Sequence, residues 1–351
     1  MIINILIFIA GLILLVKGSD FFVKSAASIA EKLGVSEFVI GLTLVALGTS
    51  IPELASSVIA SLKNQSGIVI GNVVGSNIAN IGLIIGVAAT IAVIKTKEDM
   101  LKRDGYIMLF AALLFYVFAL NSNISKLESI IFIILYFAYI LFLIELKPEL
   151  GEKYHFNEFI KYFFKFQYIF TIKDRLMSKA NKENKITRKQ KTEIKQLFKE
   201  ALIKDLLISA IAGAAVVFGA KYLVQEAVFF AKILNIPQTF IGISIIALGT
   251  SLPELSVSIS AARKGYGNIA IGNVIGSNIA NIFLVIGISG LIAPLTIIKS
   301  TLLYSAPFMI AMTILLLMFI KSYWKIRRTE GIIFLILYTI FIVILFSGLL
   351  P

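Results

Sequence analysis

Residues 41–86 read GLTLVALGTSIPELASSVIASLKNQSGIVIGNVVGSNIANIGLIIG, and residues 242–287 read GISIIALGTSLPELSVSISAARKGYGNIAIGNVIGSNIANIFLVIG. The two stretches align without a gap, 201 positions apart, and are identical at more than half of their positions. Duplication of a segment explains the similarity itself. It does not explain why the best-matched positions are small and polar within apolar surroundings, which indicates a polar site shared by the two copies.

The composition is that of a membrane protein. Of the 351 residues, 58% are hydrophobic and only 15% are charged, and the mean hydropathy is +0.94. Soluble chains carry about 25% charged residues. Several apolar runs reach the ~20 residues that a helix needs to cross a bilayer. We therefore expect a polytopic membrane protein.

The apolar segments predict ten transmembrane helices, five in each half. An odd number of crossings per half inserts the two copies in opposite orientations, which is the inverted-repeat plan of secondary transporters. The expected fold is an all-α membrane bundle with a first transmembrane half at 1–146, a basic loop at 147–204 and a second transmembrane half at 205–351. The predicted helices span residues 2–26, 36–63, 67–94, 105–121, 126–145, 205–233, 238–264, 267–296, 301–321 and 331–348.

Charge placement predicts the orientation. The net charge is +13, and most of the basic residues fall in the loops that follow the odd-numbered helices. The positive-inside rule places these loops, including the long basic one, in the cytoplasm and both termini outside. Such loops explain the charge without a nucleic-acid partner. The apolar N-terminus lacks the basic start of a signal peptide, so we interpret it as a retained helix.

The first repeated motif, ALGTS[IL]PEL, begins at Ala46 and again at Ala247. Pro52 and Pro253 lack an amide hydrogen, so carbonyl groups in the preceding turn are predicted to lose their helical partners. Irregular backbone at membrane depth is tolerated only where it is buried or lines a watery cavity. The freed carbonyl oxygens are therefore candidate ligands for a hard cation.

Glu53 and Glu254 follow these prolines directly. A carboxylate at membrane depth costs at least ~2.5 kcal/mol and indicates a function. Each copy also has a threonine four residues earlier, on the same helix face, and a serine beside it. These hydroxyl residues are Thr49, Ser50, Thr250 and Ser251. Oxygen ligands alone suit Ca²⁺ or Na⁺ rather than zinc or copper. The structural alternative is a proline kink that carries a neutral, hydrogen-bonded glutamate.

The second motif is GNV[VI]GSNIAN, at residues 71–80 and 272–281. Its glycines recur four residues apart, a spacing that lets helices approach closely. Polar residues recur at the same spacing and predict one stripe per copy, with Asn77 and Asn278 one position off its line. The stripes consist of Asn72, Ser76 and Asn80, and of Asn273, Ser277 and Asn281. They either hold helices together or complete a cation site that faces the glutamates; we favour the site, because carboxylates there need oxygen-rich neighbours.

At these motifs the sequence resembles the Ca²⁺/cation antiporter superfamily, specifically the prokaryotic sodium/calcium exchangers. The likeness is carried by GTSIPE at 48–53, GTSLPE at 249–254 and GSNIAN at 75–80 and 276–281. The resemblance implies a central Ca²⁺ site flanked by Na⁺ sites, and movement of helices 1 and 6 across a static core. Some relatives carry Asp where this chain has Asn281, so the site here has two carboxylates rather than three.

The resemblance also implies a role for each residue. The implied Ca²⁺ ligands are Glu53, Glu254, Thr49 and Thr250. The implied Na⁺ ligands are Ser50, Ser76, Ser251 and Ser277, with the carbonyl groups of Ala46 and Ala247. Asn80 and Asn281 would lie at the centre and contact water or ion.

The function predicted from these residues and this resemblance is a secondary antiporter that exchanges Na⁺ for Ca²⁺ by alternating access, with Ca²⁺ between Glu53 and Glu254. The alternatives are Ca²⁺/H⁺ exchange, with the glutamates as proton carriers, and a passive cation channel. An enzyme is not expected, because Ser50 has no histidine or nearby lysine to activate it. We expect no cofactor beyond the transported ions, and a multi-pass monomer in the plasma or inner membrane.

Overall fold

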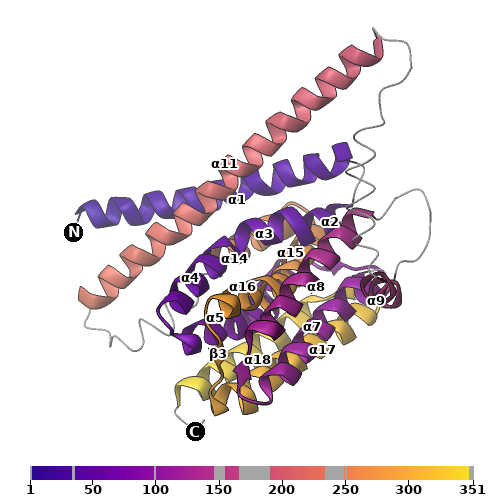
Figure 1. Ribbon diagram of the computed structural model, residues 1–351. Helices are drawn as coiled ribbons and strands as arrows, with labels where there is room; N and C mark the ends of the chain where they lie inside the picture. Colours follow the sequence, from indigo (N-terminus) through magenta and orange to yellow (C-terminus); the bar gives the residue numbers. More distant parts are fainter. Residues whose placement is uncertain are drawn as a thin grey trace.

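The computed structural model describes residues 2–33, 36–98, 100–145, 155–165, 190–233, 249 and 251–347. These residues are almost entirely helical, and two long helices cross over a bundle of shorter ones (Figure 1). Several helices contain wider π-helical turns, labelled η. Most of the first half of the predicted helix 238–264, residues 238–248 and 250, lies outside the described residues.

The first half contains a long helix, a helix broken at Ser50 and three further helical stretches. Its elements are α1 (Ile2–Leu33), α2 (Glu37–Ile40), η1 (Gly41–Val45), α3 (Ala46–Thr49), α4 (Ile51–Leu62), α5 (Ser66–Ala79), η2 (Asn80–Ile85), α6 (Gly86–Ile91), β1 (Ile94–Lys95), η3 (Met100–Gly105), α7 (Tyr106–Ala119), β2 (Asn123–Ile124) and α8 (Lys126–Glu145).

From α14 on, the second half repeats this order. Its elements are α11 (Gln190–Ile233), α14 (Leu252–Arg263), α15 (Gly267–Ala280), η6 (Asn281–Ile286), α16 (Gly287–Ile292), β3 (Leu295–Thr296), η7 (Thr301–Ser305), α17 (Ala306–Lys321), β4 (Lys325–Ile326) and α18 (Arg328–Phe346). From α14 to β3, each element begins and ends 201 residues after its counterpart in the first half. The repeat found in the sequence is therefore also a repeat of helix ends and π-helical turns.

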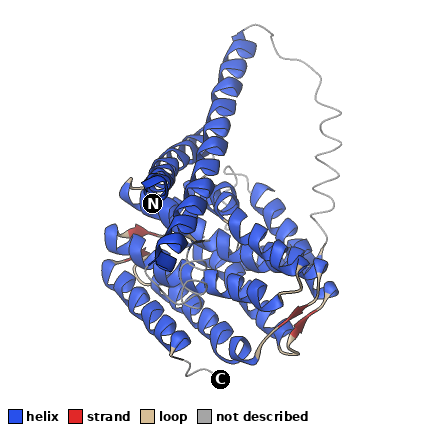
Figure 2. Ribbon diagram, turned by 90° about the vertical axis from the view of Figure 1, so that its left-hand side faces the viewer, coloured by secondary structure: helices blue, strands red, loops and turns tan. Residues whose placement is uncertain are grey.

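Two short antiparallel strand pairs join the halves. β1 pairs with β4 and β2 pairs with β3. Exchanging the halves converts one pair into the other, as a two-fold relation requires. The two pairs lie at opposite ends of the helical bundle (Figure 2).

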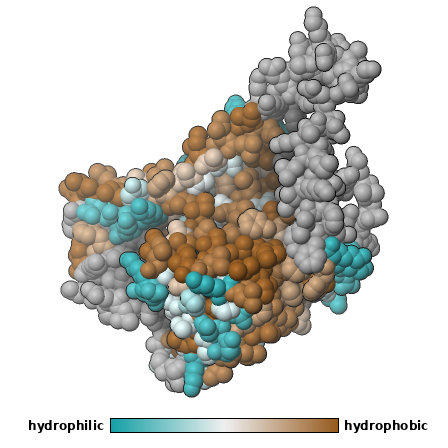
Figure 3. All heavy atoms as spheres, in the orientation of Figure 1, coloured by the Kyte–Doolittle hydropathy of each residue, from teal (hydrophilic) through white to brown (hydrophobic). Residues whose placement is uncertain are grey.

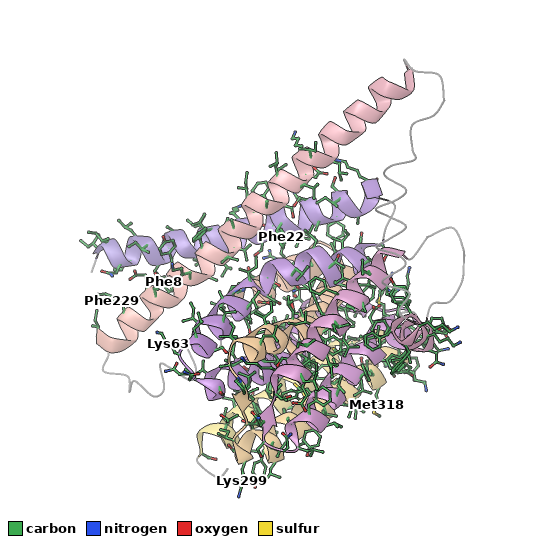
Figure 4. All side chains as sticks on the ribbon, in the orientation of Figure 1. Phe8, Phe22, Lys63, Phe229, Lys299 and Met318 are labelled. Atoms are coloured by element: carbon green, nitrogen blue, oxygen red, sulfur yellow. The ribbon has the colours of Figure 1, made fainter. Side chains whose placement is uncertain are left out.

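The buried apolar side chains form two clusters of unequal size. One large cluster of buried side chains joins α5–α8 to α15–α18. A second, smaller cluster joins α1 and α11 to α14 and the start of α15. Phe22 lies in this smaller cluster, beneath the crossing of the long helices and above the bundle (Figure 4). The α1–α11 pair is thus attached to the bundle through a limited apolar contact.

The long helices approach closely because Gly18 and Gly219 lie at their crossing. A Cβ atom at Gly219 would lie 2.5 Å from the backbone nitrogen of Leu15, and one at Gly18 would lie 3.1 Å from that of Val216. Small residues at such crossings allow backbone contact within a membrane. Hydrogen bonds from Lys32 to Asp205 (2.6 Å) and from Asn4 to Glu226 (2.8 Å) also join the pair.

The surface fits a bilayer. Among the described residues, seven helices are long and apolar enough to cross a membrane, or eight if the broken helix 37–62, bent by 45°, is one span. Figure 3 shows a broad apolar area with hydrophilic residues gathered in separate patches. The chain is therefore a multi-pass membrane protein, while the count of ten crossings and their inverted arrangement stay predictions.

The predicted basic loop contains two helical parts. α9 (Phe156–Phe164) packs Phe159 and Tyr162 against Phe142 of α8. His155 lies at its start, where its backbone N–H donates to Glu158. α11 begins at Gln190 rather than at the predicted residue 205. The earlier start has a simple cause, because residues 190–204 are mostly good helix formers.

Candidate cation site

The site is built on a helix interrupted at Ser50 and on the start of α14. α3 ends at Thr49 and α4 begins at Ile51, with a 45° bend between them. Ser50 at the break has φ −83° and ψ 6°, and Ser251, directly before α14, has φ −89° and ψ 5°. Pro52 and Pro253 occupy the first turns that follow, where a missing N–H leaves no hydrogen bond unmade. The break at Ser50 therefore lies where Pro52 predicts it, and α14 begins at the equivalent position.

Glu53 and Glu254 are both buried, each 1% exposed, in the first turns of α4 and α14. Ser50 Oγ donates to Glu254 Oε1 at 3.2 Å, and Ser251 Oγ donates to Glu53 Oε1 at 3.4 Å. Each carboxylate is thus hydrogen-bonded to the serine of the opposite half. The two acidic residues predicted from the repeat meet in one site.

Ser76 and Ser277 extend these contacts. Ser277 Oγ lies 3.0 Å from Ser50 Oγ, and Ser76 Oγ lies 3.2 Å from Ser251 Oγ. A carboxylate can only accept, so the serines of the first motif donate to the glutamates and accept from those of the second. Four predicted hydroxyl groups therefore adjoin the two carboxylates, in two equivalent chains.

Asn80 and Asn281, the last residues of the two copies of the second motif, are also predicted site residues. Each is 1% exposed and begins a π-helical segment. The amide nitrogen of Asn80 donates to Asn278 Oδ1 at 2.9 Å, and that of Asn281 donates to Asn77 Oδ1 at 3.0 Å. Among the described residues, neither Asn80 Oδ1 nor Asn281 Oδ1 has a hydrogen-bond partner, although both are buried. A cation would satisfy such oxygens.

Thr49 and Ala46 adjoin the site from α3. Thr49 Oγ1 lies 3.1 Å from Asn273 Oδ1 and 3.3 Å from the carbonyl oxygen of Ala46. That carbonyl also accepts from the backbone nitrogen of Ser50 at 3.0 Å. The expectation that it lacks a helical partner is therefore wrong, because the helix continues to Ser50 before it breaks. Thr250 and Ala247 lie outside the described residues.

Asn72 and Asn273 hold the acidic helices in place. Asn72 Nδ2 donates to the backbone oxygen of Glu53 at 3.2 Å and to Ser57 Oγ at 2.9 Å. Asn273 Nδ2 makes the equivalent contacts, at 3.5 Å to the backbone oxygen of Glu254 and 3.1 Å to Ser258. The sequence analysis did not single out Ser57 or Ser258. The signal that could have found them is that both copies of the repeat have serine at this position.

The glycines of the second motif allow close packing. A Cβ atom at Gly272 would lie 2.5 Å from the backbone oxygen of Phe38, and one at Gly276 would lie 2.7 Å from Ala46 Cβ. The predicted packing role is confirmed for this copy. The repeat places the partners of Gly71 and Gly75 outside the described residues, so for that copy the role stays a prediction.

The site offers only hard ligands. Its groups are carboxylate, hydroxyl and amide oxygens, which suit Na⁺ and Ca²⁺. Within the part of the chain that the structure describes, no group of three or more His, Cys, Asp or Glu could hold a metal ion.

Comparisons with known proteins agree with this geometry. The family model described as sodium/calcium exchanger protein matches residues 3–145 and 204–347. Sodium/calcium exchanger MaX1 of Methanosarcina acetivorans is 55% identical over 345 residues, which cover 98% of this chain and 99% of that protein. The putative antiporter CaxA of Alkalimonas amylolytica is 31% identical over 344 residues, which cover 97% and 98%.

Solved structures are similar over the same extent. The sodium-calcium exchanger NCX_Mj, soaked with 10 mM Na⁺ and zero Ca²⁺, matches with a TM-score of 0.78 and 32% identity. The match covers 97% of this chain and 98% of that one. The likeness therefore includes both halves and is not limited to the two motifs.

Proposed function

The chain belongs to the sodium/calcium exchanger family, and from this premise we propose that it exchanges Na⁺ for Ca²⁺ across the membrane. The family consists of ion antiporters rather than enzymes, as the sequence predicts. The observation that carries the proposal is the pair of buried carboxylates, Glu53 and Glu254, each hydrogen-bonded to the serine of the opposite half.

We propose that Ca²⁺ binds between Glu53 and Glu254. Two carboxylates balance its charge, and buried carboxylates without a cation or proton would be costly at membrane depth. Thr49 and Thr250 are the further proposed Ca²⁺ ligands. The proposed Na⁺ ligands are Ser50, Ser76, Ser251 and Ser277, with the carbonyl oxygens of Ala46 and Ala247. Because Ser50 and Ser251 contact the same carboxylates, occupancy by one ion disfavours the other.

We further propose alternating access by an inverted repeat. The reciprocal strand pairs and hydrogen bonds support a two-fold relation between the halves. The close approach of α1 and α11 at Gly18 and Gly219, and the smaller apolar cluster through which the pair meets the bundle, support their movement as a pair. In this arrangement both termini lie outside, the segment 147–204 lies in the cytoplasm, and one monomer carries the whole site.

The experiment is ⁴⁵Ca²⁺ uptake into proteoliposomes preloaded with Na⁺, K⁺ or H⁺. Na⁺-loaded vesicles take up Ca²⁺, and Glu53→Gln or Glu254→Gln abolishes uptake because one charge on the ion stays uncompensated. Glu158→Gln, in α9 and outside the site, is the matched control and retains uptake.

The other outcomes identify the competing functions. Uptake driven by a pH gradient without Na⁺ would instead indicate Ca²⁺/H⁺ exchange. Single-channel currents would indicate a passive channel. Retained Na⁺-driven uptake in both glutamine variants would refute the assigned site.

A further inference from the structure

Asn77 and Asn278 are equivalent asparagines that lie off the predicted polar stripes. Both are 1% exposed, on α5 and α15. Asn77 Nδ2 donates to the backbone oxygen of Asn278 at 3.3 Å, and Asn278 Nδ2 donates to that of Asn77 at 3.4 Å. The pair thus forms a reciprocal bridge between the two copies of the second motif.

This bridge fixes which way each amide points. A backbone carbonyl oxygen can only accept, so the Nδ2 atoms of Asn77 and Asn278 must face it. Their Oδ1 atoms then point away and accept from the Nδ2 atoms of Asn281 (3.0 Å) and Asn80 (2.9 Å). As a consequence, the Oδ1 atoms of Asn80 and Asn281 are the ends left without a donor among the described residues.

We propose that Asn77 and Asn278 are positioning residues, which hold Asn281 and Asn80 with their oxygens rather than their NH₂ groups turned to the transported ion. The inference rests on the proposed function. An NH₂ group presents partial positive charge and would repel a cation, so the orientation of these amides matters for binding. Backbone carbonyls, which substitution of a side chain does not remove, are the origin of the orientation.

If Asn77 orients Asn281, the effect of Asn77→Ala on Ca²⁺ binding should depend on which residue stands at position 281. A packing role alone would not produce this dependence. Asn77→Ala frees the Asn281 amide to turn, and the KM for Ca²⁺ in Na⁺-driven uptake rises roughly tenfold, with a smaller change in maximal rate. In an Asn281→Asp chain both ends of the side chain are oxygen, so turning has no consequence. There, Asn77→Ala changes the KM by less than about twofold.

The control is Ser61→Ala, which removes a buried 2.6 Å hydrogen bond to the backbone of Ser289, outside this network, and leaves the KM unchanged. If Asn77→Ala fails to fold, Asn278→Ala with and without Asn80→Asp repeats the test at the equivalent positions. An equal rise in both backgrounds, or no rise in either, overturns the inference. Absence of Na⁺-driven uptake by the unmodified chain refutes the proposed function instead.

Discussion

Ser50 and Ser251 connect the halves at the scale of single residues. Their hydroxyl groups donate to Glu254 and Glu53 at 3.2 and 3.4 Å, and each also contacts a serine of the second motif. The exchange of partners means that each carboxylate is held in part by the opposite half. Substitutions at the two serines should therefore have similar effects, although they lie far apart in sequence.

Ser50→Ala or Ser251→Ala should weaken Na⁺ binding more than Ca²⁺ binding. Each removes a proposed Na⁺ ligand, and a hydrogen bond to a charged group is worth ~1.5–3 kcal/mol, so the KM for Na⁺ rises about tenfold or more. The measurement is the Na⁺ and Ca²⁺ dependence of exchange in proteoliposomes, with Ser61→Ala as control. Equal losses for both ions would show that the serines do not discriminate between them.

The candidate site was largely predictable residue by residue, and its connections were not. The repeat identifies Glu53, Glu254 and the serines because polar residues at membrane depth are costly. Which half holds which carboxylate depends on how α4 and α14 face each other, a long-range relation that no local pattern contains. Asn77 escaped the prediction because it lies off the stripe spacing.

At the scale of elements, α1 and α14 meet through polar contacts. Ser19 Oγ donates to Ser256 Oγ at 2.8 Å, and Asp20 accepts from Ser260 at 2.6 Å and pairs with Lys264 at 3.0 Å. If α1 and α11 move as proposed, these contacts form and break during each cycle.

A disulfide between these helices should stop transport. The chain has no cysteine, so Ser19→Cys with Ser256→Cys introduces the only possible pair. Side-chain atoms in hydrogen-bond contact need small rotations to reach an S–S length of about 2.05 Å. We expect oxidation of the double variant to abolish uptake and a reductant to restore it. Uptake by each single variant should change with neither the oxidant nor the reductant. Full uptake by completely cross-linked protein would contradict movement of α1 against α14.

The sequence predicts the positions of long apolar helices better than it predicts short strands or the packing of short helices. Apolar runs locate α8 at its predicted residues, 126–145, because length and hydropathy determine a span. The four two-residue strands were not predicted, since strands so short leave no periodic pattern. The packing of α9 was not predicted either, because Phe159 and Tyr162 fit a membrane interface as well as a protein core.

At the scale of the whole molecule, charge distinguishes the two ends of the bundle. The β1–β4 pair places Lys95 directly opposite Lys325, whereas the β2–β3 pair places Asn123 opposite Thr296. Like charges opposite each other are unfavourable, so their presence at one end only needs a reason. The positive-inside rule supplies one and assigns the lysine pair to the cytoplasm.

This assignment gives a direct test of the inverted repeat. Lys95 and Thr296 are equivalent positions, 201 residues apart, and both are exposed. In the cysteine-free chain, we expect Lys95→Cys to react with a membrane-impermeant maleimide from the cytoplasmic side only, and Thr296→Cys from the outside only. Lys325→Cys is the control. Because Lys325 pairs with Lys95 across the two strands, Lys325→Cys should react with the maleimide from the same side as Lys95→Cys. Labelling of both equivalent positions from one side would mean that the halves insert in the same orientation, and the proposed alternating-access symmetry would fail with it.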